Sequence, residues 1–191
     1  MYGCAIPTFD GIRNTLRHTS ATWPGLPLKW INLREEPVVY VRGKPYVLRE
    51  AARPFHNLQE YSGITAERVS AMEARLKVDV LCEAACYERR LLVCRESDDG
   101  QVTSEWEEEV KAAAVMTPEE MFSDPAVLVG LPEGTRAPTY LRIPITHQRT
   151  PKKTDFDRLA EVFVELKVRS IIIQPLLNSH LPRLLRGVPA N

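Results

Sequence analysis

The order of apolar and polar positions along the chain predicts alternating helices and strands, which is typical of an α/β fold. A short helix that Thr8 or Asp10 can cap is expected first, and an apolar strand over 28–33 follows it. Residues 38–48 then read as two strands joined by a turn that contains glycine and proline. The amino-terminal quarter therefore predicts a helix, a buried strand and a hairpin.

A long amphipathic helix is predicted from Thr65 to about Tyr87. Its apolar residues recur every three or four positions and form one inward stripe of Val69, Met72, Leu76, Val80, Ala84 and Tyr87. The apolar run 91–94 after it reads as a buried strand.

The stretch 101–138 predicts less regular structure. A returning strand is expected over 101–106, and the acidic run 105–109 reads as a solvated face. Thr117, with the proline and acidic residues after it, marks a short helix that ends near Phe122. The rest is rich in proline and glycine and reads as loop.

A βαβ crossover is predicted next, from a strand over 140–145 to a continuous apolar strand over 169–173. Between them, Thr154 is expected to cap a helix and Asp157 to complete its capping box. The inner face of that helix is predicted to hold Phe156, Leu159, Ala160, Phe163 and Leu166. Residues 174–191 contain three prolines and predict a poorly anchored tail with, at most, a short helix around 181–185.

The amino-acid composition limits the classes of function that this chain can have. The 191 residues are 44% hydrophobic and 26% charged, which suits one domain with a real core. Twenty-five basic side chains balance 25 acidic ones, so no net field would recruit nucleic acid or a membrane surface, and any anion site must be local. No run approaches the roughly 20 apolar residues of a membrane span, and no leader pattern opens the chain, so a cytoplasmic protein is expected.

The cysteines indicate reduced thiols, because all four lie in apolar contexts. Cys82 and Cys86 share a helical face, but no further cysteine or histidine has metal-ligand spacing nearby. Neither a metal nor another cofactor is expected. The sequence contains neither a glycine-rich phosphate loop nor a serine elbow, so it gives no sign of a different enzyme chemistry.

Arg34, Glu35 and Glu36 directly follow the strand expected over 28–33. In open α/β sheets ligands bind outside the carboxyl ends of strands, so Arg34 is a candidate contact for an anion. The same charges also fit a surface ion-pair network without a ligand. The residues alone leave both interpretations open.

Several separate segments resemble the paladin-like proteins, which are related to the protein-tyrosine-phosphatase-like inositol polyphosphate phosphatases, or phytases. The matching segments are Tyr2-Gly-Cys-Ala-Ile-Pro-Thr with Gly11-Ile-Arg-Asn, residues 30–50, Met72-Glu-Ala-Arg-Leu-Lys, Trp106 with Thr117-Pro-Glu-Glu, and Arg142-Ile-Pro-Ile-Thr running to Pro151-Lys-Lys-Thr-Asp-Phe-Asp. The resemblance implies a cysteine-phosphatase-like central sheet with flanking helices and a small hairpin extension, incomplete after the last central strand. It divides the chain into a partial phosphatase-like domain, 1–173, and a divergent tail, 174–191.

The resemblance also implies phosphoester hydrolysis through a cysteinyl-phosphate intermediate. In the family's loop a cysteine, five further residues and an arginine hold the phosphoryl group, together with backbone N–H groups and a helix N-terminus. Six positions beyond each cysteine of this chain stand Asp10, Glu88, Leu92 and Gly100, and no cysteine follows Cys94. The loop is therefore absent from these 191 residues, and we expect no turnover.

Other family positions are present. His147 stands where family members have the general-acid aspartate, and a histidine can donate a proton near neutral pH; the alternative is an exposed loop histidine. Arg34 matches the family's Leu-Arg-Glu-Glu motif, while Lys152 and Lys153 match its basic Pro-Lys positions. These three residues are the candidate phosphate-binding residues.

Two functions remain open. The first is an incomplete, inactive phosphatase-family member, produced by splicing, truncation or an imperfect gene model, or forming part of a tandem protein. The alternative is a non-catalytic, pseudophosphatase-like module that weakly binds a phosphorylated small molecule, a phosphoprotein or another protein. The oligomeric state stays undetermined, and an ordered tail over 174–191 would favour the module.

Overall fold

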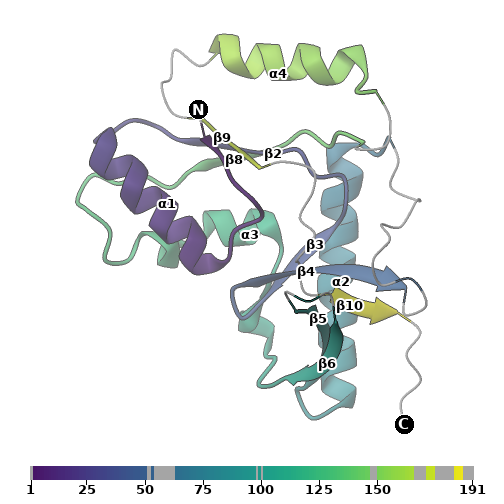
Figure 1. Cartoon of the computed structure of the whole chain (residues 1–191). Helices are drawn as coiled ribbons and strands as arrows, with labels where there is room; N and C mark the ends of the chain where they lie inside the picture. Colours follow the sequence, from purple (N-terminus) through teal and green to yellow (C-terminus); the bar gives the residue numbers. More distant parts are fainter. Residues whose placement is uncertain are drawn as a thin grey trace.

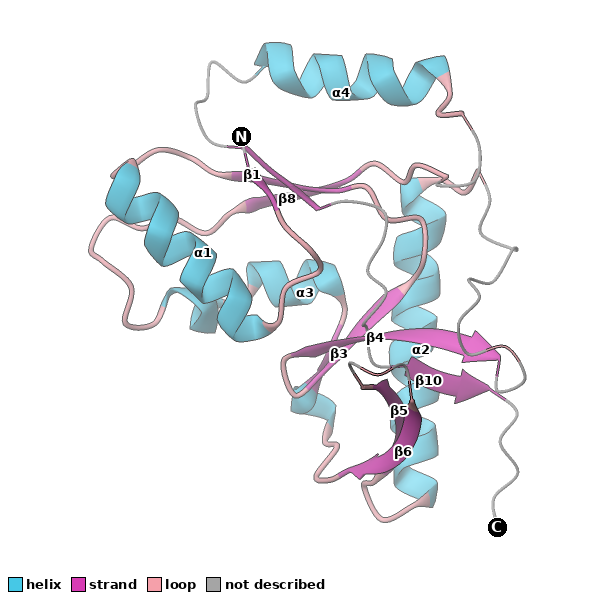
Figure 2. Ribbon diagram, viewed as in Figure 1, coloured by secondary structure: helices cyan, strands magenta, loops and turns pink. Residues whose placement is uncertain are grey.

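The computed structural model describes residues 2–50, 53, 63–97, 99, 101–146, 150–165, 171–174 and 183–186. Over these ranges the molecule is a mixed α/β protein with two sheets and flanking helices (Figure 1). The predicted fold class is confirmed. Figure 2 shows the same arrangement by secondary structure, with the smaller sheet between helices and the larger one beside the longest helix.

The smaller sheet is parallel throughout and carries the predicted βαβ crossover. Its strands, in spatial order, are β1 (Tyr2–Gly3), β9 (Ile171–Gln174), β2 (Lys29–Asn32) and β8 (Thr139–Arg142). Helix α4 (Lys153–Glu165) connects β8 to β9 and lies on one side of this sheet, while α1 (Phe9–Thr22) and α3 (Pro118–Ser123) lie on the other (Figure 1). The strands expected near 28–33, 140–145 and 169–173 are confirmed, with ends shifted by one to three residues.

The larger sheet has six strands, mostly antiparallel. In spatial order they are β6 (Val102–Glu107), β5 (Leu91–Glu96), β10 (Arg183–Arg186), β4 (Lys44–Glu50), β3 (Val38–Val41) and β7 (Val115–Met116). The predicted hairpin is the β3–β4 pair, and the predicted returning strand is β6. Helix α2 (Ala66–Cys86) contacts β3, β5 and β7.

The sequence explains how α1 and α3 begin. Thr8 caps α1, since its Oγ1 accepts a hydrogen bond of 3.1 Å from the Gly11 amide. Thr117 and Glu120 form a reciprocal capping box at α3. Two short 3₁₀ helices, η2 (Ala112–Ala114) and η3 (Pro125–Leu128), lie on either side of α3 along the chain.

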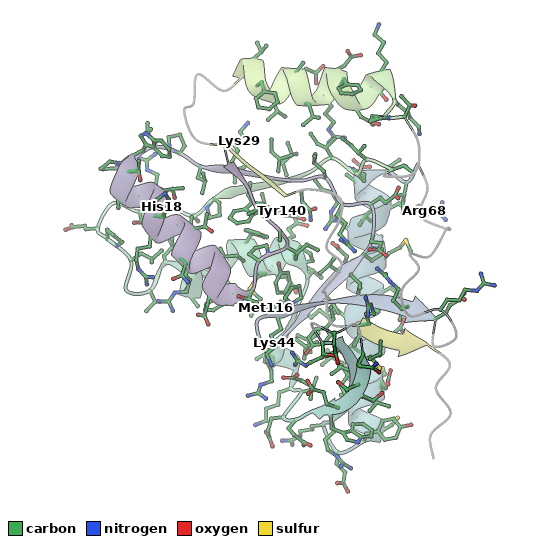
Figure 3. The ribbon with its side chains drawn as sticks, viewed as in Figure 1. His18, Lys29, Lys44, Arg68, Met116 and Tyr140 are labelled. Carbon is green, nitrogen blue, oxygen red and sulfur yellow. The ribbon has the colours of Figure 1, made fainter. Side chains whose placement is uncertain are left out.

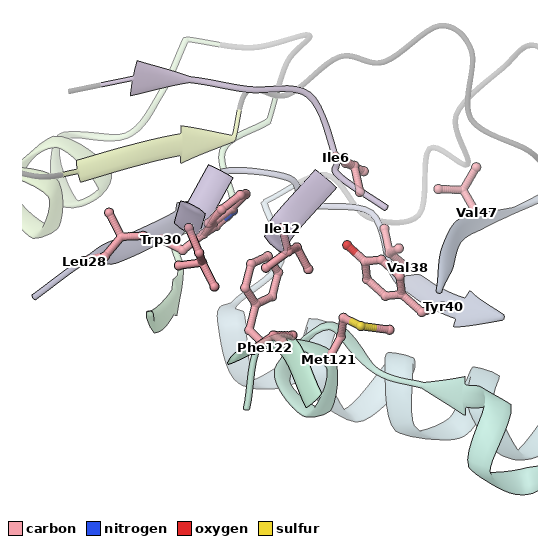
Figure 4. Close-up of a cluster of buried hydrophobic side chains, with 11 residues drawn as sticks. Ile6, Ile12, Leu28, Trp30, Val38, Tyr40, Val47, Met121 and Phe122 are labelled. Atoms are coloured by element: carbon pink, nitrogen blue, oxygen red, sulfur yellow. The ribbon is translucent and has the colours of Figure 1, made fainter. Parts of the chain in front are cut away.

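An apolar core joins α1, α3 and the adjoining edges of both sheets (Figure 4). Trp30 and Phe122 lie with ring centroids 4.7 Å apart, and Ile12 and Leu16 of α1 are buried in the same cluster. Packing of this core fixes β2 between the helices.

The long helix α2 begins at its predicted cap, Thr65, but its buried stripe differs from the prediction. Val69, Leu76, Val80 and Ala84 are buried as expected. Glu73 takes the buried position that Met72 was predicted to hold, because two hydrogen bonds satisfy its carboxylate there.

The acidic run 105–109 was predicted to be solvated, and this is wrong for Glu107. Its side chain is only 7% exposed. It accepts hydrogen bonds from Tyr46 Oη at 2.9 Å and Arg95 Nη2 at 3.1 Å, which offset the cost of its burial.

Helix α4 begins before the predicted cap. Thr154 lies inside the helix, and Asp155, not Asp157, makes the capping contact by accepting a hydrogen bond from the Lys152 amide at 2.9 Å. The predicted inner face is also displaced: Phe156 and Phe163 are exposed, whereas Val162 is buried. Leu166 lies outside the described residues.

The sequence predicted at most a short helix around 181–185. The structure has strand β10 at Arg183–Arg186 instead. This strand pairs with β4 in parallel and with β5 in antiparallel orientation. Local propensity missed it because the pairing partners are far away in the sequence.

Candidate functional site

The carboxyl ends of three parallel strands meet at one edge of the smaller sheet. Asn32 is in register with both Arg142 and Gln174, the last residues of β8 and β9. The chain continues beyond β2 and β8 in parallel, since the Ile145 amide donates to the Leu33 carbonyl at 2.9 Å. This edge is where α/β folds bind ligands, and it holds the predicted Arg34 segment.

Arg34 is buried rather than exposed. Its side chain is 3% exposed and forms an ion pair with Glu36. Glu36 also accepts hydrogen bonds from Arg49 of β4, one of them 3.2 Å long. The ion-pair network expected at Arg34 is therefore present but buried, not on the surface, because Arg34 is enclosed with Glu36 and Arg49. The anion contact expected at Arg34 stays a prediction.

Arg142 ties the same segment to helix α2. Its Nη2 donates to Glu73 Oε1 at 2.5 Å, and its Nη1 donates to the Arg34 carbonyl at 3.0 Å. Asn32 Oδ1 accepts a hydrogen bond of 2.9 Å from the Arg34 amide. Two neighbouring strand ends thus hold the Arg34 backbone in place.

Tyr140 completes this polar cluster. Its hydroxyl accepts hydrogen bonds of 2.8 Å from both Arg142 Nη2 and Asn32 Nδ2. The Tyr140 ring, labelled in Figure 3, stacks on Phe122 of α3 with the ring centroids 4.9 Å apart. Arg142, Asn32 and Tyr140 are thus joined by hydrogen bonds, whereas Arg142 Nε is buried without a hydrogen-bond partner among the described residues.

Burial shifts the acid–base properties of these groups. Desolvation raises the pKa of Glu73 to about 7, although Arg142 and the Val38 amide oppose the shift. Burial likewise raises the pKa of Tyr140 to about 12 and lowers the pKa of Arg34, while Glu36 counteracts the loss at Arg34. The cluster therefore contains one carboxyl group that titrates near neutrality.

Lys152 and Lys153 are exposed, in contrast to Arg34. A Cβ atom added to Gly63 would lie 3.3 Å from Lys152 Nζ, so the ammonium group lies beside the Gly63 backbone. The Gly63 amide donates to Thr146 Oγ1 at 2.9 Å, which joins this segment to the loop after β8. His147 lies outside the described residues.

Sequence reasoning missed Asn32, Glu73, Arg142 and Gly63 as members of this region. Glu73 and Arg142 had a detectable signal, since each is a charged residue beside apolar positions within a family-like segment. Gly63 had no such signal in the sequence, because its closeness to Lys152 arises only from the fold.

None of the four cysteines is followed by an arginine six positions later. Cys4 directly follows β1, whose Gly3 is in register with Ile173, so it lies near the same sheet edge. Burial raises the pKa of its thiol to about 11, which keeps it protonated at neutral pH. Cys94 is buried against Ser104, while Cys82 and Cys86 are exposed on α2.

The described residues contain no group of three or more His, Cys, Asp or Glu side chains that could hold a metal ion. No helix in the same ranges combines the length and apolar character needed to cross a bilayer.

Known proteins resemble this chain in sequence and in structure. Paladin from Gallus gallus is 30% identical over 164 residues, which are 84% of this chain and 16% of paladin. The structure of the tandemly repeated protein tyrosine phosphatase like phytase from Mitsuokella multacida superimposes with a TM-score of 0.62 at 17% identity, covering 90% of this chain and 25% of that one. A PTP-like phytase from Bdellovibrio bacteriovorus gives a TM-score of 0.50 at 16% identity, covering 90% and 51%.

This chain thus spans at most about half the length of these relatives. The PTP-like phytase family model, described as "Inositol hexakisphosphate", matches residues 31–174. The matched range includes the carboxyl ends of β2, β8 and β9. With its sequence likeness to paladin, this match shows that the chain belongs to the protein-tyrosine-phosphatase-like phytase family.

Proposed function

We propose that this 191-residue chain is a non-catalytic member of the family that binds phosphorylated ligands at the carboxyl edge of the smaller sheet. The observation that carries the proposal is the state of the thiols. No cysteine is followed at the required distance by arginine, and Cys4, beside the sheet edge, has a pKa raised to about 11. A protonated thiol without a phosphate loop does not attack phosphorus.

Charge supports the ligand class. Lys152 and Lys153 place two exposed ammonium groups at the start of α4, while Arg142, which ends β8, and Arg34, which follows β2, are both buried. The family model is described as "Inositol hexakisphosphate", and the PTP-like myo-inositol phosphatase from Mitsuokella multacida, a structural relative, has a structure in complex with myo-inositol-(1,3,4,5)-tetrakisphosphate. An inositol polyphosphate is accordingly the first ligand to test, and binding should be weak because the family's phosphate loop is absent.

The test is calorimetry at low salt with myo-inositol hexakisphosphate. Wild type should give a saturable heat that Lys152→Ala/Lys153→Ala reduces at least roughly tenfold in affinity, since two point charges are lost. Lys44→Ala/Lys111→Ala, which removes one lysine from β4 and one from the position before η2, should leave the affinity within about twofold. No heat in wild type, or equal losses in both double variants, would refute binding at this edge.

A phosphoserine peptide is the second probe. A phosphorylated protein partner presents the same phosphate chemistry with fewer charges, so it should compete with the inositol polyphosphate if both occupy this edge. Tighter binding of the peptide would assign the site to phosphoproteins.

A second candidate function follows from the relatives' greater length. We propose that the segment can also serve as the substrate-side part of a longer phosphatase, whose phosphate loop would be encoded after Ile173. Sequencing the transcript tests this directly. An in-frame cysteine, five residues and an arginine after Ile173 support it, and a transcript that encodes these 191 residues alone contradicts it.

A further inference from the structure

Glu73 forms hydrogen bonds to the candidate site although it belongs to helix α2 and not to the loops at the sheet edge. Its Oε1 accepts a hydrogen bond of 3.1 Å from the amide of Val38, where β3 begins. The same oxygen accepts the bond from Arg142, which in turn holds the Arg34 carbonyl. One carboxylate therefore anchors both ends of the segment between β2 and β3, through the Arg34 carbonyl near its start and the Val38 amide just after it.

Buried ion pairs surround Glu73. Among the described residues, Arg142 pairs with Glu73, while Arg34 and Arg49 pair with Glu36. A proton on Glu73 would remove the negative charge that faces Arg142. Buried positive charge would then increase below the loop that carries Arg34.

We infer that Glu73 is a positioning residue for the candidate phosphate site and that its protonation tunes anion binding there. The ligand readout of this inference rests on the proposed function, whereas its structural readout does not. Lys152 and Lys153 would attract the anion. Glu73 would set the net charge around Arg142 and the position of the Arg34 backbone.

The groups that face Glu73 are Arg142 and Tyr140 of β8, Tyr40 of β3 and Glu119 of α3. The two phenols keep their protons at neutral pH because burial raises the pKa of each. Glu73 itself has a pKa of about 7, so a change near neutrality can be traced to it.

The structural readout is the Val38 amide resonance, followed by NMR as pH varies. In wild type it should shift with a midpoint near 7, and Glu120→Gln, which changes an exposed glutamate, should show the same titration. Glu73→Gln should show no such titration. An unchanging wild-type resonance, or the same midpoint in Glu73→Gln, overturns the positioning role. The wild-type midpoint alone remains decisive if Glu73→Gln fails to fold.

The ligand readout is calorimetry with inorganic sulfate, whose charge stays constant over this range. Wild type should bind sulfate several-fold to roughly tenfold more tightly one pH unit below the midpoint than one unit above it. Glu73→Gln should lack this dependence. Measurable binding with equal affinity at both pH values in wild type overturns the tuning. Absence of sulfate binding contradicts the proposed function and the tuning together, while the Val38 titration still decides the positioning role.

Discussion

Arg142 Nη2 lies 2.5 Å from Glu73 Oε1, in an interior where both side chains are at most 3% exposed. The pair joins the carboxyl end of β8 in the smaller sheet to α2, the helix that packs on the larger sheet. Removal of one partner leaves the other charge buried without its counterion, and such changes are strongly destabilising.

Arg142→Met should lower the free energy of unfolding by about 3–5 kcal/mol, because Glu73 loses its charged partner. Chemical denaturation measures the change. The double variant Arg142→Met/Glu73→Leu should recover most of the loss, since neither charge then stays buried. As a control, Arg75→Met at the exposed Arg75–Asp79 pair should cost less than about 0.5 kcal/mol. A loss below about 1 kcal/mol for Arg142→Met would show that the buried pair is not needed to hold β8 against α2.

The pH dependence of stability should report Glu73. Its pKa in the folded protein is about 7, above the ordinary 4.5, so the folded state binds more protons than the unfolded state between these values. The free energy of unfolding should therefore fall as pH rises through this window, by up to about 3 kcal/mol, and then level off. Denaturation of wild type and Glu73→Gln at matched pH isolates this contribution as their difference. A difference that stays constant across the window would contradict the raised pKa.

Glu107 should matter far more to stability than its neighbour Glu105. Glu107→Ala leaves the Tyr46 hydroxyl without its carboxylate acceptor and should cost about 2–3 kcal/mol. Glu105→Ala, at a half-exposed position on the same strand, should cost less than about 0.5 kcal/mol. Thermal and chemical unfolding of both variants test the difference, and similar losses would mean that the acidic run is solvated throughout.

Gly43 should tolerate alanine less well than Gly25. Both have positive φ, of 76° and 72°, so alanine is strained at either position. Only at Gly43 would the new Cβ lie 2.8 Å from Phe9 Cβ, whereas nothing lies within 4 Å at Gly25. Gly25→Ala should lower stability by about 1 kcal/mol and Gly43→Ala by about 2–4 kcal/mol. Equal losses would show that the contact between α1 and the hairpin turn is dispensable.

Local patterns predicted the elements whose signals lie within a few residues. Thr8, Thr65 and Thr117 were predictable caps, and the β3–β4 hairpin followed from its turn residues. Strands β2, β8 and β9 were predictable from their apolar runs.

What the sequence could not predict depends on distant partners. Glu107 looks like part of a solvated acidic run until β5 and β4 bring Arg95 and Tyr46 to it. Arg34 was correctly placed after β2, but its burial depends on Glu36 and Arg49, which requires the contact between the two sheets. Strand β10 was missed for the same reason, because its pairing to β4 and β5 carries no local signal.

Phosphate release from myo-inositol hexakisphosphate tests the central claim of a non-catalytic family member most directly. The assay should use wild type at a ligand concentration that saturates the calorimetric signal, with Cys4→Ser in parallel. We predict that neither protein releases phosphate above the buffer, because the Cys4 thiol stays protonated and the sequence provides no phosphate loop. Release by wild type that Cys4→Ser abolishes would contradict this account and identify Cys4 as a nucleophile.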